Sequence, residues 1–256
     1  MRELRRCPAG ARADSWGGDT GLDRVRLRLT YRRLRRAAGR PRRVFEAGYG
    51  GGGLLARFAA DGSEIAGAEP GVLGVPVDPR VVATGRLFPG PVEQVPVELD
   101  GTFDLVYAVH VAEHVADPVA FAARCARLLG PGGVLVWLTP TADSHGPHLF
   151  GSSWWMLEDP SHVRFFSEAS VRLLLRDQGL ADITVIRCLG DSLSVEAASL
   201  VRRLRGRGDR PGAGVLPGLG VRALSAAVLP VTLAARAVSP RLRPTLQVVA
   251  RRPGSP

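Results

Sequence analysis

Short apolar runs alternate with longer segments of helical spacing through the middle of this chain. Strand-like runs occupy positions 43–47, 64–68, 103–109 and 134–138. Between them, positions 54–60 and 119–129 place apolar side chains three and four residues apart, which predicts amphipathic helices. Strands that alternate with helices are typical of a parallel sheet covered by helices on both faces. The pattern therefore predicts an α/β fold with a doubly wound sheet.

The flanking segments extend this pattern. Positions 22–38 mix apolar residues with arginines and predict a basic helix that ends before Gly39. Ser167 and Gly179 bracket another predicted helix as its N-cap and its stop. Two more strands are predicted at 183–188 and 245–250. The stretch 71–96 is rich in proline and glycine, and the pattern places no strand within it.

One domain is predicted over residues 21–256, preceded by a flexible leader at 1–20 without hydrophobic periodicity. Within it, residues 190–244 are predicted to form an inserted helical segment before the last strand. Its uncharged part, 223–235, is interrupted by Pro230 and is too short to cross a bilayer. We find no secretory signal and no uninterrupted apolar run of membrane-spanning length, and we expect a cytoplasmic protein.

The amino-acid composition weakens what the net charge implies about binding partners. The 256 residues carry a net charge of +10 and a pI near 11.0, values that favour nucleic acid or an anionic membrane as partners. The chain has no lysine and no asparagine, however, so arginine supplies every basic side chain, as in proteins from GC-rich genomes. This bias weakens the argument from charge, and we do not expect nucleic acid binding. Three scattered cysteines exclude a disulfide framework and fit a reducing compartment.

A glycine cluster follows the first predicted strand and precedes a helix. Its residues are Glu46, Ala47, Gly48, Tyr49, Gly50, Gly51 and Gly52. A second acid, Glu69, ends the next strand. In a doubly wound sheet this turn binds nucleotide-like ligands, because bare backbone admits close approach and an acid at the second strand end accepts hydrogen bonds from ribose hydroxyls.

The residues present narrow the choice of ligand. A phosphate-binding P-loop needs a lysine, which the chain lacks. The dinucleotide spacing can be laid onto Gly48, Gly50 and Gly53, so NAD stays open on spacing alone. A carboxylate at Glu46 would repel a pyrophosphate, but it suits a ligand that ends in an ammonium group. S-adenosylmethionine fits both acids, with adenosine at Glu69 and an amino-acid tail at Glu46.

Two stretches resemble the class I S-adenosylmethionine-dependent methyltransferases over about residues 42–188. The first is the acid-x-Gly-x-Gly-x-Gly motif from Glu46 to Gly52. The second begins with the strand at 103–107, continues through the Glu-His-Val turn at Glu113 and ends with Leu-Gly-Pro-Gly-Gly at 129–133. The resemblance implies a Rossmann-like, mostly parallel seven-stranded sheet with an antiparallel last strand. It also implies S-adenosylmethionine as the methyl donor.

The resemblance assigns a role to each matching residue. Glu46 would hold the amino group of the donor, and Glu69 its ribose hydroxyls. His110 would lie beside the sulfonium, and Val92 and Glu93 would border the adenine. The residues implied to hold the methionine and ribose parts are Ala47, Gly48, Tyr49, Gly50 and Gly52.

The histidines all fall between positions 110 and 162, near the predicted carboxyl ends of the strands. Neutral imidazole is well suited to accept a proton near neutral pH. His162 stands in a Pro-Ser-His segment ahead of Phe-Phe-Ser, which resembles the acceptor-covering loop of one methyltransferase branch. It is our candidate general base or acceptor ligand, and a structural hydrogen bond is the alternative. No two histidines show helix-face ligand spacing with a carboxylate or thiolate, so no metal site is predicted.

The acceptor is indicated mainly by what the sequence lacks. In resembling families an Asn-Pro-Pro-Tyr-like turn marks amino-group methylation of nucleic acid or protein, and none follows the strand at 103–109. We therefore expect an oxygen of a small-molecule or a glycan- or lipid-type acceptor. The apolar stretch 223–235 beside arginines also allows peripheral membrane contact. Two alternatives stay open: an RNA methyltransferase, or, because Pro91 replaces an acid of many relatives, a degenerate binding or scaffold protein.

Overall fold

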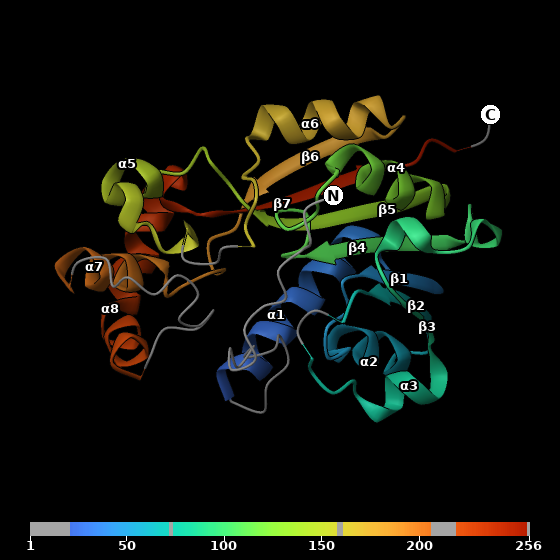
Figure 1. Ribbon diagram of the computed structural model, residues 1–256, viewed down its shortest axis with the longest axis horizontal. Coiled ribbons are helices and arrows are strands. Elements are labelled where there is room, and N and C mark those ends of the chain that lie inside the picture. Colours follow the sequence, from blue (N-terminus) through green and yellow to red (C-terminus); the bar gives the residue numbers. More distant parts are fainter. Residues whose placement is uncertain (1–20, 72–73, 158–160, 206–218, 255–256) are drawn as a thin grey trace, which may run out of the picture.

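The computed structural model describes residues 21–71, 74–157, 161–205 and 219–254. Its centre is one seven-stranded sheet with the strand order β3-β2-β1-β4-β5-β7-β6 (Figure 1). The strands are β1 Arg43–Ala47, β2 Glu64–Glu69, β3 Arg86–Pro89, β4 Phe103–Val109, β5 Leu129–Pro140, β6 Ala181–Arg187 and β7 Thr245–Arg251. The predicted leader at 1–20 lies outside the described residues.

The sheet is parallel except at one strand. Neighbouring strands from β3 to β5 pair in parallel, whereas β7 runs antiparallel to both β5 and β6. The predicted mostly parallel sheet with an antiparallel last strand is confirmed. Because β1, β2 and β4 are parallel, their carboxyl ends meet at one edge of the sheet, where ligands bind in folds of this kind.

Alternate residues of the central strands pack into two hydrophobic layers. Val44 and Leu105 pack with α1 (Gly21–Ala38), α2 (Gly53–Ala60) and α3 (Pro79–Thr84). Phe45 and Val106 pack on the other side with α4 (Pro118–Leu128) and α6 (Glu168–Asp177). Figure 1 shows these helices above and below the sheet. Successive side chains of a strand point to opposite faces, so a strand covered on both sides is apolar throughout.

Local capping fixes where the helices begin. The hydroxyl of Ser167 accepts from the Ser170 backbone N–H, and the hydroxyl of Ser170 accepts from the Ser167 N–H, both at 2.9 Å. This reciprocal capping box confirms Ser167 as the predicted N-cap of α6. Asp117 caps α4 with its side chain, which accepts hydrogen bonds from the Val119 and Ala120 N–H groups.

Three local predictions were wrong. A third strand does exist: β3 is a four-residue edge strand, too short for its alternation to be visible within a stretch rich in Pro and Gly. Strand β5 begins at Leu129 rather than at 134, because Leu129 already pairs with Phe103 of β4, ahead of an irregularity in the ladder where Gly132 has a φ of +74°. Helix α8 (Leu219–Val238) continues through Pro230, which was expected to interrupt it. Pro230 is exposed, so solvent can satisfy the carbonyl that the missing N–H leaves.

The described residues between β6 and β7 form two helices. They are α7 (Val195–Arg205) and α8, which pack against each other, followed by the short 3₁₀ turn Pro240–Leu242. Since α8 is unbroken, its segment Gly220–Val238 is long and apolar enough to cross a membrane, with 19 residues and a mean hydropathy of 1.5. The sequence predicted no such segment, because the uncharged run 223–235 is short and contains Pro230.

Candidate functional site

The glycine turn after β1 follows a path that side chains would obstruct. Gly48 has φ +76°, and a Cβ there would lie 2.5 Å from Cγ2 of Val111, which follows β4. The Gly48 N–H donates to the carbonyl of Ala68 at 2.8 Å, which joins the turn to the end of β2. Gly50 also has positive φ, at +49°, but nothing lies within 4 Å of the place where its Cβ would stand. Bare backbone at Gly50 therefore faces open space.

Glu69 connects the second strand to this turn. Its Oε2 accepts a 2.9 Å hydrogen bond from the Gly50 N–H, and its Oε1 accepts a 3.0 Å bond from the Gly71 N–H. The structure thus brings together the glycine cluster and the second acid, which are well separated in the sequence. The carboxylate is held in one orientation at the edge where β1 and β2 end.

Glu46 is buried, with 4% of its surface exposed. The phenol of Tyr107, on the neighbouring strand β4, donates a 2.9 Å hydrogen bond to its Oε2. Burial raises the pKa of Glu46 well above its ordinary value; the bond from Tyr107 opposes this rise, and the negative charge of nearby Glu69 adds to it. In the described part of the chain, no arginine pairs with this carboxyl group.

These features fit the amino-acid end and the ribose of S-adenosylmethionine. A buried carboxyl group with a raised pKa and no cationic partner is a natural site for a ligand ammonium. The oriented Glu69 carboxylate matches two vicinal hydroxyls. Tyr49 lies half-buried in the turn and packs over Gly67, where a Cβ would stand 2.8 Å from Tyr49 Cδ1. Ala47 is buried at the end of β1.

The two residues expected beside an adenine lie in the short 3₁₀ helix Val92–Gln94, after β3. Val92 is buried in the core shared with α4, whereas Glu93 is exposed. In this structure Val92 therefore contributes packing, and Glu93 is the member of the pair whose side chain reaches solvent.

His110 directly follows β4 and has an unusual backbone conformation. Its φ of +54° is rare for a residue other than glycine. Its Nδ1 lies 3.2 Å from Glu113 Oε1, and its Nε2 lies 3.2 Å from Asp191 Oδ2. Burial alone lowers the pKa of His110, but the charges and hydrogen bonds of Asp191 and Glu113 outweigh it and raise the pKa to about 9. At neutral pH an imidazolium therefore lies between two carboxylates.

Asp191 is the site residue that the sequence did not reveal. It follows β6 in the predicted insert, and hydroxyls of Ser192 and Thr245 donate to its Oδ2 at 2.9 and 2.8 Å. Burial opposes ionisation of Asp191, but the charge and hydrogen bond of His110, the charge of Arg26 and the hydrogen bond from Thr245 hold its pKa below the ordinary value. An isolated acid in a segment rich in Gly and Ser carries no spacing signal. Its pairing with His110 joins segments that are 81 positions apart in the sequence.

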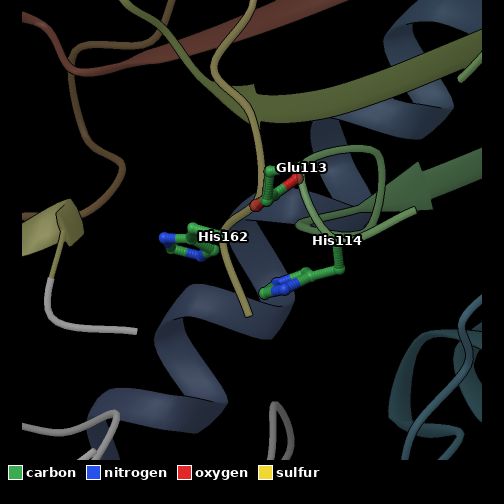
Figure 2. A group of neighbouring side chains, drawn as sticks. All are labelled: Glu113, His114 and His162. Atoms are coloured by element: carbon green, nitrogen blue, oxygen red, sulfur yellow. The ribbon is translucent and has the colours of Figure 1, made fainter. Parts of the chain in front are cut away.

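A second cluster lies where the Glu-His-Val turn meets the segment after residue 160. Ligand atoms of Glu113, His114 and His162 all lie within 4.8 Å of one another (Figure 2). A carboxylate with two imidazoles is a donor set that divalent cations accept. Both oxygens of Glu113, however, already accept hydrogen bonds, one from His110 and one from the hydroxyl of Thr139 at 3.0 Å. That this chain holds no metal site therefore stays a prediction. Spacing along the chain could not reveal this cluster, because His162 lies far from Glu113 and His114 in the sequence.

The orientation of His162 is set by its surroundings. Its Nδ1 lies 2.6 Å from the carbonyl of Met156, so Nδ1 carries a proton, and in the neutral ring the lone pair lies on Nε2. The ring packs against His114 at a tilt of 44°, with 4.7 Å between ring centroids, and meets the ring of Phe165 edge-on. His114 in turn is held by Ser161, through contacts of its Nδ1 with the carbonyl and the hydroxyl.

The aromatic segment beside His162 is packed against the insert. Trp154 and Met156 are buried with Val195 of α7, and Phe165 lies against Trp154 at a centroid distance of 5.0 Å. These aromatics form a packed cover. This cover places the segment that carries His162.

The sequence pattern of the family described as "Methyltransferase domain" matches residues 22–185. A ubiquinone biosynthesis O-methyltransferase of Rhizobium etli is 35% identical over 105 residues, covering 36% of this chain and 39% of that protein. The enzyme of the same description from Cereibacter sphaeroides is 29% identical over 147 residues, covering 54% of this chain and 60% of that protein. The chain thus spans about two-fifths to three-fifths of the length of these relatives.

Solved structures show the same fold. Phosphoethanolamine N-methyltransferase 2 of Haemonchus contortus, in complex with S-adenosyl-L-methionine, superposes with a TM-score of 0.62 at 15% identity. The superposition covers 88% of this chain and 52% of that one. The predicted Rossmann-like methyltransferase architecture is confirmed.

Proposed function

This chain belongs to the methyltransferase domain family, which is S-adenosylmethionine-dependent, and from that membership we propose that it methylates an oxygen of a small-molecule acceptor. The observation that carries the proposal is the pair of acids at the glycine turn. Glu46 is a buried carboxyl group to which no arginine of the described residues is paired, and Glu69 is a carboxylate held on the Gly50 N–H. Together they match the two polar ends of the donor.

The roles of the donor-site residues follow from this arrangement. Glu46 would bind the ammonium of the methionine part, and Glu69 would bind the ribose hydroxyls. Backbone at Gly48, Gly50 and Gly52 would lie against the ligand, with Ala47 and Tyr49 shaping the turn. The donor supplies a methyl group on a sulfonium, which is already an activated leaving group, so the protein mainly aligns the acceptor and excludes water.

His162 is proposed as the general base. Because its Nδ1–H donates to the Met156 carbonyl, the lone pair lies on Nε2, on the side of the ring that can take a hydroxyl proton. His110 is a poor candidate for this role, since both of its ring nitrogens face carboxylates. We propose instead that His110 positions Glu113 and the turn after β4 beside the sulfonium.

Oxygen as the methyl acceptor is supported by the curated relatives, which are described as O-methyltransferases. The proposed acceptor is a small molecule or a glycan- or lipid-type molecule. A cytoplasmic location belongs to the same proposal. RNA is the alternative acceptor on account of the arginines, and a scaffold that does not turn over is the alternative role.

The decisive experiment is calorimetry with S-adenosylmethionine and its demethylated product, followed by acceptor screening with methyl-labelled donor. We expect saturable binding of both donor forms and transfer of label to hydroxylated small molecules. Absence of heat with either form would leave only the scaffold role. Label in RNA, with affinity that falls steeply as salt is added, would favour the alternative acceptor.

A further inference from the structure

Helix α8 turns an apolar face to solvent. Every exposed residue of α8 in the described part of the chain is Gly, Ala, Pro or Val, and beyond Gly220 they recur three or four positions apart along one side. They are Ala223, Ala226, Ala227, Pro230, Val231, Ala234, Ala237 and Val238. Val231 is 71% exposed and Val238 is 86% exposed. A surface helix ordinarily presents polar residues to solvent and apolar residues to the core.

The opposite face of the same helix carries its polar residues. Thr232 and Arg236 are buried, the latter with 1% of its surface exposed. The Arg236 guanidinium donates to both oxygens of Glu196 at 2.8 Å and to the carbonyl of Asp191 at 2.6 Å. These bonds fix which side of α8 faces outward. They also tie the helix to α7, so it cannot cross a bilayer without losing them.

The surroundings of this face are basic. After Glu196 the only acid in the sequence is Asp209, whereas α7, α8 and the turn that follows α8 carry arginines at 202, 203, 222, 241 and 243. Arg203 and Arg241 are exposed, and α7 adds Leu200 and Leu204, which are 44% and 77% exposed. Apolar side chains flanked by arginines match a membrane surface that contains anionic lipids. A second copy of this chain would instead bring like charges together.

We infer that the outer face of α8, defined by Ala223, Ala227, Val231, Ala234 and Val238, lies in the headgroup region of a bilayer containing anionic lipids. The helix lies along the interface with its inner face still packed on α7. This inference does not rest on the proposed reaction, because vesicle binding is measured without donor or acceptor.

The test is co-sedimentation of the full chain with vesicles of phosphatidylglycerol and phosphatidylcholine, compared with vesicles of phosphatidylcholine alone. We expect binding to the anionic vesicles and at least about tenfold weaker binding to the neutral ones. The double variant V231E/V238E should lose about tenfold or more of its binding to anionic vesicles, since two apolar contacts become charged. The matched control V97E/V119E carries the same charge change on valines that are 69% and 55% exposed elsewhere, and it should bind like the wild type.

The depth of α8 in the bilayer is measured in a separate experiment. A tryptophan placed by Val231→Trp should be quenched most by lipids brominated near the headgroup, as expected for an interfacial helix. Wild-type protein that does not bind, or V231E/V238E that binds equally well, would overturn the inference. So would a wild-type dimer that V231E/V238E converts to monomer without any vesicle binding, because a second copy would then cover this face.

Discussion

The backbone N–H of Gly50 donates a 2.9 Å hydrogen bond to Oε2 of Glu69, and that bond joins the turn after β1 to the end of β2. The other oxygen of the carboxylate accepts from Gly71 at 3.0 Å. The acid proposed to bind ribose is therefore oriented by the protein itself. A group oriented in advance loses little conformational freedom on binding, which favours affinity.

Replacement of Glu69 by glutamine should weaken donor binding by about 10- to 100-fold, because hydrogen bonds to a charged acceptor contribute roughly 1.5–3 kcal/mol. Calorimetric titration with S-adenosylmethionine measures the change. Glu64→Gln is the matched control, since Glu64 begins the same strand with 79% of its side chain exposed. Equal affinity of E69Q and wild type would remove Glu69 from the donor site.

Glu46 should link donor binding to protons. Burial raises the pKa of this carboxyl group well above its ordinary value, so the free protein keeps a proton on it at pH values where an exposed glutamate is ionised. A bound ammonium would favour the ionised form and release the proton. Affinity for the donor should therefore rise as pH increases beyond the ordinary range of a glutamate carboxyl, up to the range where the ammonium itself titrates.

Titrations in buffers of different ionisation enthalpy report the released protons directly. Glu46→Gln should abolish both the release and the pH dependence while retaining the fold. If E46Q kept the pH dependence of the wild type, another group would have to supply the proton.

The sequence revealed the elements that carry strong local signals and missed contacts made between distant segments. Strands β1 and β4 were predicted with their observed bounds, because strands buried on both faces are unbroken apolar runs. The glycine turn and Glu69 follow from motif and topology. Asp191 lies 81 positions from its partner His110, and no pattern along the chain encodes such a distance. The apolar stretch 223–235 was visible in the sequence, and peripheral membrane contact was predicted for it, but which of its side chains face solvent depends on packing that the pattern does not show.

The contact between His110 and Asp191 should make stability depend on pH. The pKa of His110 is raised from 6.5 to about 9 in the folded protein, so its contribution is fully present below about pH 6.5 and is lost as pH rises through 9. The loss amounts to roughly 3 kcal/mol at most over that window. Urea unfolding at about pH 6 and pH 9.5 measures the difference.

Asp191→Asn should flatten this dependence, because the asparagine cannot hold the imidazolium by charge. His148→Gln is the control, since His148 is exposed on the short helix Gly146–Phe150. A D191N protein that loses as much stability with rising pH as the wild type would show that the pair does not set the titration.

His162→Ala should lower kcat by about 10²- to 10⁴-fold, the usual range for loss of a general base, while donor affinity stays unchanged. Loss of a merely structural histidine would leave the pH profile of kcat unchanged, whereas loss of a general base removes the acidic limb of that profile. His148→Ala serves as the control for turnover. Unchanged kcat and an unchanged profile in H162A would return this residue to a structural role.

The variant Gly50→Val tests whether the donor lies at the glycine turn, and its effect on donor binding can be told apart from its effect on the stability of the fold. Apart from the adjoining residues of the chain, no protein atom lies within 4 Å of a Cβ at Gly50, so the Cβ of the valine enters open space, where the donor is proposed to lie. Its φ of +49° makes the substitution strained by about 1–2 kcal/mol. Gly101→Val is matched, with φ +71° and no atom within 4 Å, in a turn before β4 at the other end of the sheet. Both variants should lose similar stability on thermal unfolding, and only G50V should lose detectable donor binding. If G50V bound the donor as tightly as G101V, the turn after β1 would not be the place where the donor lies, and the roles given to Glu46 and Glu69 would fail with it.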